Sequence, residues 1–174
     1  SRRQRQMCIR DRPRFIYISK IDEDHSDYNA TFDALRERFG NKIAPVVVPT
    51  LDENKKVTGL MDILNKRAYE MQDGKRVEIE LPEDKVAVIN EFNDALKESV
   101  AETSEEFMER FFNGEDFTYA EMAQGLRQGV RELSVFPVLC GSAVAGMGSL
   151  MLLDNIVELL PSPEQGNYHK ATLA

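Results

Sequence analysis

The sequence predicts an α/β protein in which a parallel sheet flanked by helices is interrupted by an α+β insertion. Two short apolar, β-prone runs, residues 15–18 and 135–140, are typical of strands in a parallel sheet. An amphipathic helix follows each run in the sequence. The region between them differs, because alternating polar and apolar residues there precede several helical stretches. We therefore expect one sheet unit that resumes after an inserted subdomain.

The first part of the sheet unit, residues 13–50, is expected to contain a strand, a helix and a second strand. The run at 15–18 suits a central strand of the sheet. Residues 27–39 place apolar side chains on one helical face, and Gly40 supplies a stop. The run at 44–48 is apolar and β-branched, but prolines in and after it cannot donate to a neighbouring strand. It is expected to be an edge strand or a strand end.

The insertion is predicted to cover residues 51–131 and to begin with β structure. Residues 51–81 are broken into short segments by turn signals, of which Asp73-Gly74 is typical of a hairpin. Apolar and charged residues alternate after this turn, as in a strand with one buried face. The apolar set is Val77, Ile79 and Leu81. These patterns favour a small antiparallel sheet.

Helices are predicted for the rest of the insertion. One apolar helical face is built of Ile89, Phe92, Leu96 and Val100. Two capping boxes, Thr103-x-x-Glu106 and Thr118-x-x-Glu121, are each expected to open a further helix. The phenylalanines and methionines after the first box, Phe107 and Phe111 among them, recur at the spacing of core residues. We expect them to pack in the core.

The sheet unit resumes over residues 132–162, with the strand at 135–140 and a helix at 150–160 that Pro161 ends. Residues 163–174 are interpreted as a linker to a following domain. Residues 1–12 contain five arginines and almost no apolar periodicity. They are interpreted as a leader that is non-native or disordered, and a basic arm that binds RNA is the alternative.

Composition and charge argue against several classes of function. The chain carries 22 Lys and Arg against 30 Asp and Glu, a net charge of −8, which argues against a broad phosphate-binding surface. We therefore expect no direct nucleic-acid site. No apolar run approaches the roughly 20 residues that span a bilayer, and no secretory signal opens the chain, so a cytoplasmic protein without a membrane partner is expected. Cys8 and Cys140 lack the spacing of a disulfide framework or a metal site.

Two polar motifs follow the predicted sheet strands, where ligands of open α/β sheets bind. They are Ser19-Lys20-Ile21-Asp22 and Gly141-Ser142-Ala143. A carboxylate such as Asp22 can accept hydrogen bonds from guanine N1 and N2, whereas adenine offers no matching donor pair. The Lys20 stem can lie along the base while its ammonium bonds to other loops. In the second motif, small residues let backbone N–H groups approach the guanine carbonyl oxygen. Each motif alone is also typical of a polar loop, so the prediction depends on finding the two together.

The first motif resembles the Asn/Thr-Lys-x-Asp box of guanine-nucleotide-binding proteins, and the second resembles their Ser-Ala box. Position 19 departs from the pattern, because the single hydroxyl of Ser19 cannot reproduce both the donor and the acceptor of an Asn side chain. About 120 residues separate the two motifs, which resembles elongation factor G and its close relatives, since these carry an extra subdomain at this point. Further resemblance lies in residues 107–115, 121–129, 137–143 and 152–163.

The resemblance implies a partial P-loop-type GTPase domain of a translational GTPase that drives translocation on the ribosome. It implies that GTP or GDP is bound by Ser19, Lys20, Asp22, Gly141, Ser142 and Ala143. It also implies that the inserted subdomain offers acidic helices to the ribosomal stalk protein, with Glu102, Glu105, Glu106 and Glu109 as candidates. A solvated face is the alternative for these four glutamates.

The sequence contains no Gly-x-x-x-x-Gly-Lys-Ser/Thr loop to hold phosphates and no upstream switch segments. This chain alone is therefore not expected to hydrolyse GTP, and Mg²⁺ is expected only in a longer parent GTPase. Two alternatives in the same superfamily are a tetracycline-resistance ribosomal protection protein and a release factor 3-type GTPase. An alternative of another class is a non-enzymatic interaction domain that binds the ribosomal stalk.

Overall fold

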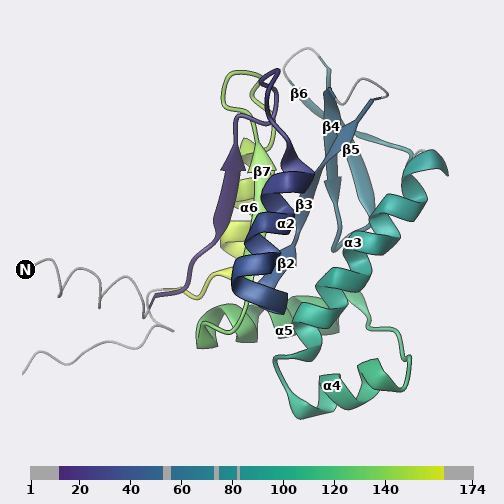
Figure 1. Ribbon diagram of the computed structural model, residues 1–174, viewed down its shortest axis with the longest axis vertical. Helices are drawn as coiled ribbons and strands as arrows, with labels where there is room; N and C mark the ends of the chain where they lie inside the picture. The colour runs from purple at the N-terminus through teal and green to yellow at the C-terminus, as the bar shows by residue number, and fades with distance from the viewer. Residues whose placement is uncertain (1–11, 53–55, 73–74, 82, 163–174) are drawn as a thin grey trace, which may run out of the picture.

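The computed structural model describes residues 12–52, 56–72, 75–81 and 83–162 (Figure 1). Three sequence predictions fall outside these ranges. They are the leader up to residue 11, the hairpin turn at Asp73-Gly74 and the linker at 163–174.

Two sheets form the framework, and they confirm the predicted α/β class. A parallel sheet has the strand order β1-β7-β2, and an antiparallel sheet has the order β3-β4-β5-β6. The parallel strands are β1 (Ile16–Ser19), β7 (Phe136–Gly141) and β2 (Ile43–Pro45). The antiparallel strands are β3 (Val47–Leu51), β4 (Val57–Asp62), β5 (Arg67–Gln72) and β6 (Lys75–Ile79).

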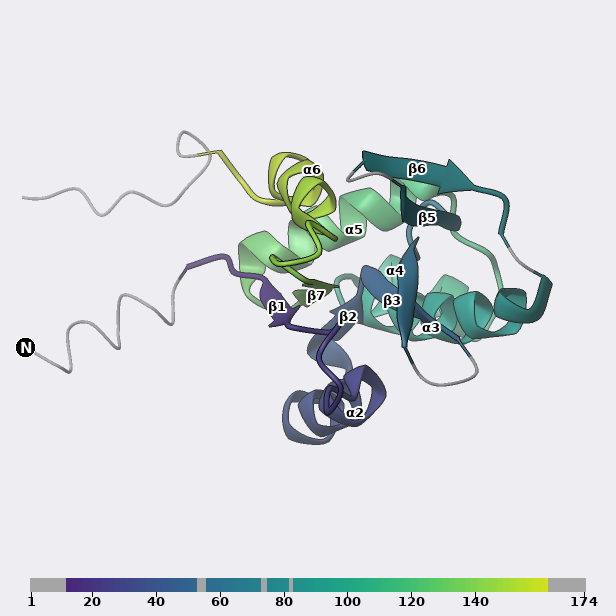
Figure 2. The same ribbon diagram turned by 90° about the horizontal axis from the view of Figure 1, so that it is seen from above.

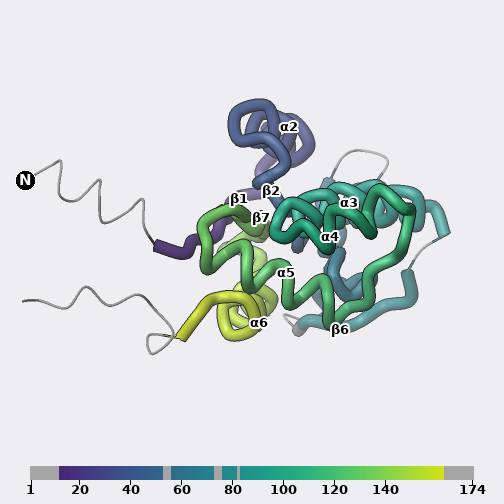
Figure 3. The backbone as a smooth tube through the Cα atoms, turned by 90° about the horizontal axis from the view of Figure 1, so that it is seen from below, coloured from purple at the N-terminus to yellow at the C-terminus, as the bar shows by residue number. Residues whose placement is uncertain are grey.

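Helices cover both sheets. They are α2 (Tyr28–Phe39), the short 3-10 helix η1 (Gly40–Lys42), α3 (Glu83–Ala101), α4 (Glu105–Phe112), α5 (Tyr119–Glu132) and α6 (Ser149–Leu159). Seen from above, α2 and α6 lie on opposite sides of the parallel sheet (Figure 2). Seen from below, α5 lies between α6 and the pair formed by α3 and α4 (Figure 3). The chain thus places the insertion beside the parallel sheet, with α5 and α6 in contact.

Two strand predictions need correction. The run at 15–18 was expected to be central, but β1 is an edge strand of the described sheet and β7 is the central one. The run at 44–48 is not one strand, because it divides between the two sheets at Val46. The N–H of Val46 donates to the Val138 carbonyl (3.0 Å), and its carbonyl accepts from the N–H of Ile63 (3.0 Å). Val46 therefore joins the parallel sheet to the antiparallel one.

Local capping signals explain where the helices begin and end. Asp27 caps α2, since its carboxylate accepts from the N–H of Ala30 (2.9 Å), and Gly40 ends it with a φ of 67°. The capping box of Thr118 and Glu121 is present at the start of α5, as predicted. The predicted box at Thr103 is wrong, because Ser104 is the N-cap of α4 and accepts from the N–H of Phe107.

The core extends across both sheets, but α4 takes little part in it. Fully buried side chains come from strands β2 and β7 and helices α3 and α5, for example Ile43, Leu139, Leu96 and Leu126. No residue of α4 is fully buried and Phe112 is 78% exposed, but Phe107 packs against the core, so the expectation that these phenylalanines pack in the core is confirmed only for Phe107. Phe107 and Phe111 are only half-buried. None of the helices in the described ranges is both long and apolar enough to cross a membrane.

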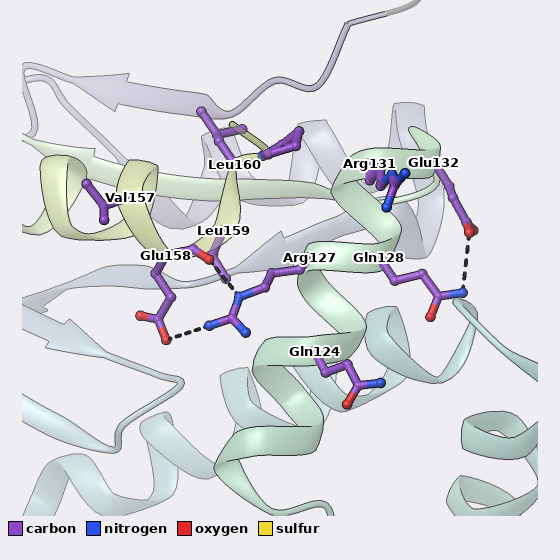
Figure 4. A pocket seen from close by; sticks show the side chains of 10 residues that line it. Gln124, Arg127, Gln128, Arg131, Glu132, Val157, Glu158, Leu159 and Leu160 are labelled. Carbon is purple, nitrogen blue, oxygen red and sulfur yellow. Dashed lines mark hydrogen bonds and ion pairs between the residues drawn. The ribbon is translucent and has the colours of Figure 1, made fainter. Parts of the chain in front are cut away.

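Helix α6 is fastened to the insertion by polar contacts at several points. Arg127 of α5 donates from Nε to the backbone carbonyl of Glu158 (2.7 Å) and lies 3.7 Å from its carboxylate (Figure 4). The last turn of α6 contains no basic residue, so Arg127 supplies the positive charge that favours a helix C-terminus. The hydroxyl of Tyr119 also donates to the Glu158 carboxylate. These bonds hold α5 against the end of α6.

Candidate guanine-recognition site

The two polar motifs lie side by side. Strands β1 and β7 are parallel, and their register pairs Ser19 with Gly141, the last residue of each strand. Adjacent strands in a sheet lie about 4.8 Å apart, so the segments that leave them begin as neighbours. The structure therefore brings together two motifs that are about 120 residues apart in the sequence.

The first motif forms a tight turn anchored by Ile21. The Ile21 side chain is buried, and its carbonyl accepts from the hydroxyl of Ser26 (2.7 Å). Lys20 adopts a left-handed conformation with a φ of 62°, which is uncommon for a residue with a side chain. On either side of the anchor, Lys20 and Asp22 are exposed. The turn thus presents one ammonium and one carboxylate at the carboxyl end of β1.

The ammonium of Lys20 is paired locally. It donates to the carboxylate of Glu23 (2.9 Å), and this hydrogen bond raises the pKa of Lys20. The sequence predicts bonds from this ammonium to other loops, but its partner belongs to the same turn. The pair is exposed, so it contributes little to stability. The Lys20 side chain is therefore able to change partner at low cost.

The second motif closes into a small loop. The N–H of Ser142 donates to the Met147 carbonyl and the N–H of Met147 donates back to the Ser142 carbonyl, both at 2.9 Å. The hydroxyl of Ser142 accepts from the N–H of Ala145 (3.1 Å). Because Gly146 has a φ of 66°, the chain can reverse direction within this loop. Ser142 is consequently buried and fixed, whereas Ala143 is exposed.

Only part of the second motif is free to meet a ligand. The N–H of Ser142 is already committed to Met147, so it is not available to a base. The N–H of Ala143 donates to no acceptor within the described part of the chain. Ala143 is thus the position of this motif where a ligand carbonyl oxygen could be bound by the backbone.

Two residues that the motifs did not indicate also shape the site. The Tyr17 side chain lies against Gly141, where any added Cβ would meet its hydroxyl and the Met147 carbonyl. Burial raises the pKa of Tyr17, with a smaller contribution from the nearby Cys140 thiol. Tyr17 is two residues before Ser19, so the alternation of a strand places both on one face. Met147 closes the loop through its backbone, a role that no side-chain pattern reveals.

The chemistry of the site is that of hydrogen-bonding recognition. One exposed carboxylate and one free amide N–H offer an acceptor and a donor at the carboxyl end of a parallel sheet. No group of three side chains with metal-binding chemistry occurs in the described ranges.

Comparison with known proteins identifies a curated relative and a similar solved structure. No family model matches it. The elongation factor G-like protein of Thermotoga maritima is 33% identical over 162 residues, which cover 93% of this chain and 23% of that protein. Over 93% of its length, the chain is therefore similar to part of an elongation factor G-like protein. A crystal structure of a protein from Thermus thermophilus has a TM-score of 0.79 at 30% identity, over 93% of this chain and 24% of that one.

The elongation factor G-like relationship confirms the predicted resemblance and the fold class. It supports a translation elongation factor family. The chain spans about a quarter of the length of the relatives it matches. The six residues predicted to bind the nucleotide stay predictions.

Proposed function

We propose that this elongation factor G-like chain forms the guanine-recognition part of a GTP-binding, ribosome-associated translation factor of the cytoplasm. The observation that carries the proposal is the register of Ser19 with Gly141, because it brings the two motifs together at the carboxyl ends of parallel strands, where open α/β sheets commonly bind ligands. The homology supports the same assignment independently.

In this proposal each motif recognises a different edge of guanine. The exposed carboxylate of Asp22 accepts from N1 and N2, and the free N–H of Ala143 donates to the carbonyl oxygen. The stem of Lys20 lies along the base once its ammonium leaves Glu23. Adenine would leave Asp22 without its donor pair, which is the basis of selectivity. Ser19 has one hydroxyl where the Asn/Thr-Lys-x-Asp box can have an amide, so it can make fewer hydrogen bonds to the rest of the site.

Binding by this chain alone is expected to be weak and to occur without hydrolysis. Phosphate contacts supply much of the affinity of a nucleotide site, and the sequence has no loop of the type that makes them. Hydrolysis and Mg²⁺ binding are proposed for a longer protein of which such a site is a part. Calorimetry that gave micromolar GDP binding by the 174-residue chain would contradict this expectation.

The test is an NMR titration of the 174-residue chain with guanosine and with adenosine. Guanosine is expected to shift the backbone amide resonances of Ala143 and Asp22, and adenosine is not. Asp22→Asn should abolish the preference for guanosine, because an amide cannot accept two hydrogen bonds from adjacent donors as a carboxylate does. Asp24→Asn is the matched control, since Asp24 is exposed in the same turn but outside the motif. Equal shifts with both nucleosides would refute the assignment.

We also propose that the insertion binds the ribosomal stalk protein through its acidic helices. Glu105 and Glu109 of α4 are exposed and lie one helical turn apart. Replacing both with Lys should weaken binding to purified stalk protein, because it reverses the charge of this face. Asp33→Lys with Glu37→Lys on α2 has the same spacing and charge change and serves as control. Equal loss in the two double variants would show that net charge, rather than α4, governs binding.

A further inference from the structure

A small apolar cavity lies between the antiparallel sheet and the beginning of α6. Its volume is about 160 Å³. Its walls are mainly apolar side chains of β4, β5 and α6 and of the loop before α6, namely Leu60, Met71, Met147, Leu150 and Met151. Leu60, Met147 and Met151 are buried. Neither Asp22 nor Ala143 lines this cavity.

Two charged residues, Glu70 of β5 and Arg76 of β6, also line the cavity, and Arg76 has partners. Arg76 of β6 pairs with Asp154 of α6 (2.9 Å), and its guanidinium lies 5.1 Å from the centre of the Tyr69 ring. The side chain of Arg76 therefore bridges from the antiparallel sheet to α6 beside the cavity. Because its charge is balanced by Asp154 and it stacks on an aromatic ring, an anionic ligand would have to displace an existing ion pair. A neutral ligand would not.

We propose that this cavity binds a small neutral aromatic or apolar molecule. An engineered protein cavity of roughly 150 Å³ lined by apolar side chains stays dry and binds benzene. The volume of the present cavity, 160 Å³, is similar. Three of the five apolar wall residues are methionines, whose unbranched, polarizable side chains adapt to a ligand and contact aromatic rings favourably. The volume limits the ligand to about one six-membered ring.

The cavity is coupled by backbone contacts to the loop that carries Ala143. Met147 lines the cavity, and its N–H and carbonyl both bond to Ser142. A ligand that moves Met147 must therefore act on the residue next to Ala143. By linkage, any effect of the cavity ligand on the loop is matched by an equal effect of the loop on the ligand.

The test is an NMR titration of the 174-residue chain, labelled at the methionine methyl groups, with benzene. Saturable shifts are expected for Met71, Met147 and Met151. The methyl groups of Met61 and Met122 are internal controls, because these buried residues do not line the cavity. Benzoate should bind more weakly than benzene, since its carboxylate meets no unpaired cation among the described residues there. Saturable binding of benzene without shifts at the three lining methionines would overturn the proposal, as would no binding at all.

A matched pair of variants on α6 assigns the site. Leu150→Trp places a large ring at the rim of the cavity and should abolish the shifts caused by benzene. Leu153→Trp makes the same change on the same helix outside the lining, and it should leave the shifts intact. The two leucines are 56% and 57% exposed, so neither change is expected to unfold the chain. Retained binding in Leu150→Trp would refute the proposal. The test uses no nucleotide, so its outcome is independent of guanine recognition.

Discussion

Replacing Gly141 with Ala should disrupt the loop that carries Ala143. A Cβ built on Gly141 meets the Tyr17 hydroxyl and the Met147 carbonyl oxygen at less than the 3.0 Å that real Cβ atoms keep. The tyrosine can move its hydroxyl, but the carbonyl is part of the backbone. That carbonyl is held by the reciprocal pair of hydrogen bonds between Ser142 and Met147. The substitution therefore has to open this pair.

The magnitude follows from the two bonds that are lost. Each backbone hydrogen bond contributes about 1 kcal/mol net, so the free energy of unfolding should fall by about 2 kcal/mol. In a domain of this size that corresponds to a decrease of roughly 6 °C in the melting temperature. The shift of the Ala143 amide resonance on addition of guanosine should be lost at the same time, because the loop no longer fixes that N–H.

Thermal denaturation and the guanosine titration together measure both effects. Val144→Ala is the control, because Val144 is in the same loop and almost fully exposed. It should change the free energy of unfolding by less than about 0.5 kcal/mol. Combining Gly141→Ala with Tyr17→Phe removes one of the two contacts and should restore only part of the stability. A Gly141→Ala variant as stable as the wild type, with the same guanosine shifts, would refute the reasoning.

Three further predictions concern the core and the helix ends. Tyr28→Phe should raise the free energy of unfolding by about 1 kcal/mol in a urea titration, because the buried Tyr28 hydroxyl has no hydrogen-bond partner among the described residues; a loss of stability would contradict this. The hydrogen bond from Arg110 lowers the pKa of Glu121 to about 2, so stability present above the usual pKa should be lost as the pH falls from about 4.5 towards 2. Glu121→Gln should reduce this loss of stability at low pH, and an unchanged dependence of the free energy of unfolding on pH would exclude a contribution from Glu121. Gly129→Ala should destabilise by about 2 kcal/mol despite better helix propensity, since its Cβ would lie 2.6 Å from Cγ2 of Val135; increased thermal stability would disprove this contact.

The sequence was sufficient for elements whose cause is local. The start of α2 near Asp27 and the capping box at Thr118 are correctly predicted, because a side-chain acceptor just before the first helical N–H groups is encoded in the sequence itself. Val46 shows the limit, since a β-branched residue suits either sheet equally. Its division between the two sheets depends on Val138 and Ile63, which are far from it in the sequence.

The prediction of the N-cap of α4 and part of the prediction of the site were limited in the same way. Thr103 and Ser104 can both serve as N-caps, but the hydroxyl of Thr103 is already bonded to the Val100 carbonyl (2.6 Å) at the end of α3. The positions of the two motifs were predictable because each follows an apolar strand. The commitment of the Ser142 N–H to Met147 was not, because it depends on a loop closure that Gly146 permits.

The large insertion can be accommodated because its two ends are joined at the sheet. Ile43 pairs with Phe136, so the chain leaves β2 and returns on β7 at adjacent positions. A flexible loop of about 90 residues would cost roughly 2 kcal/mol more to close than one of about ten residues. The described part of the insertion is packed, however, since α3 packs on β2 and the hydroxyl of Ser99 donates to the Ile43 carbonyl (3.3 Å). The pairing of Ser19 with Gly141 is therefore supported by the folded insertion instead of being opposed by its length.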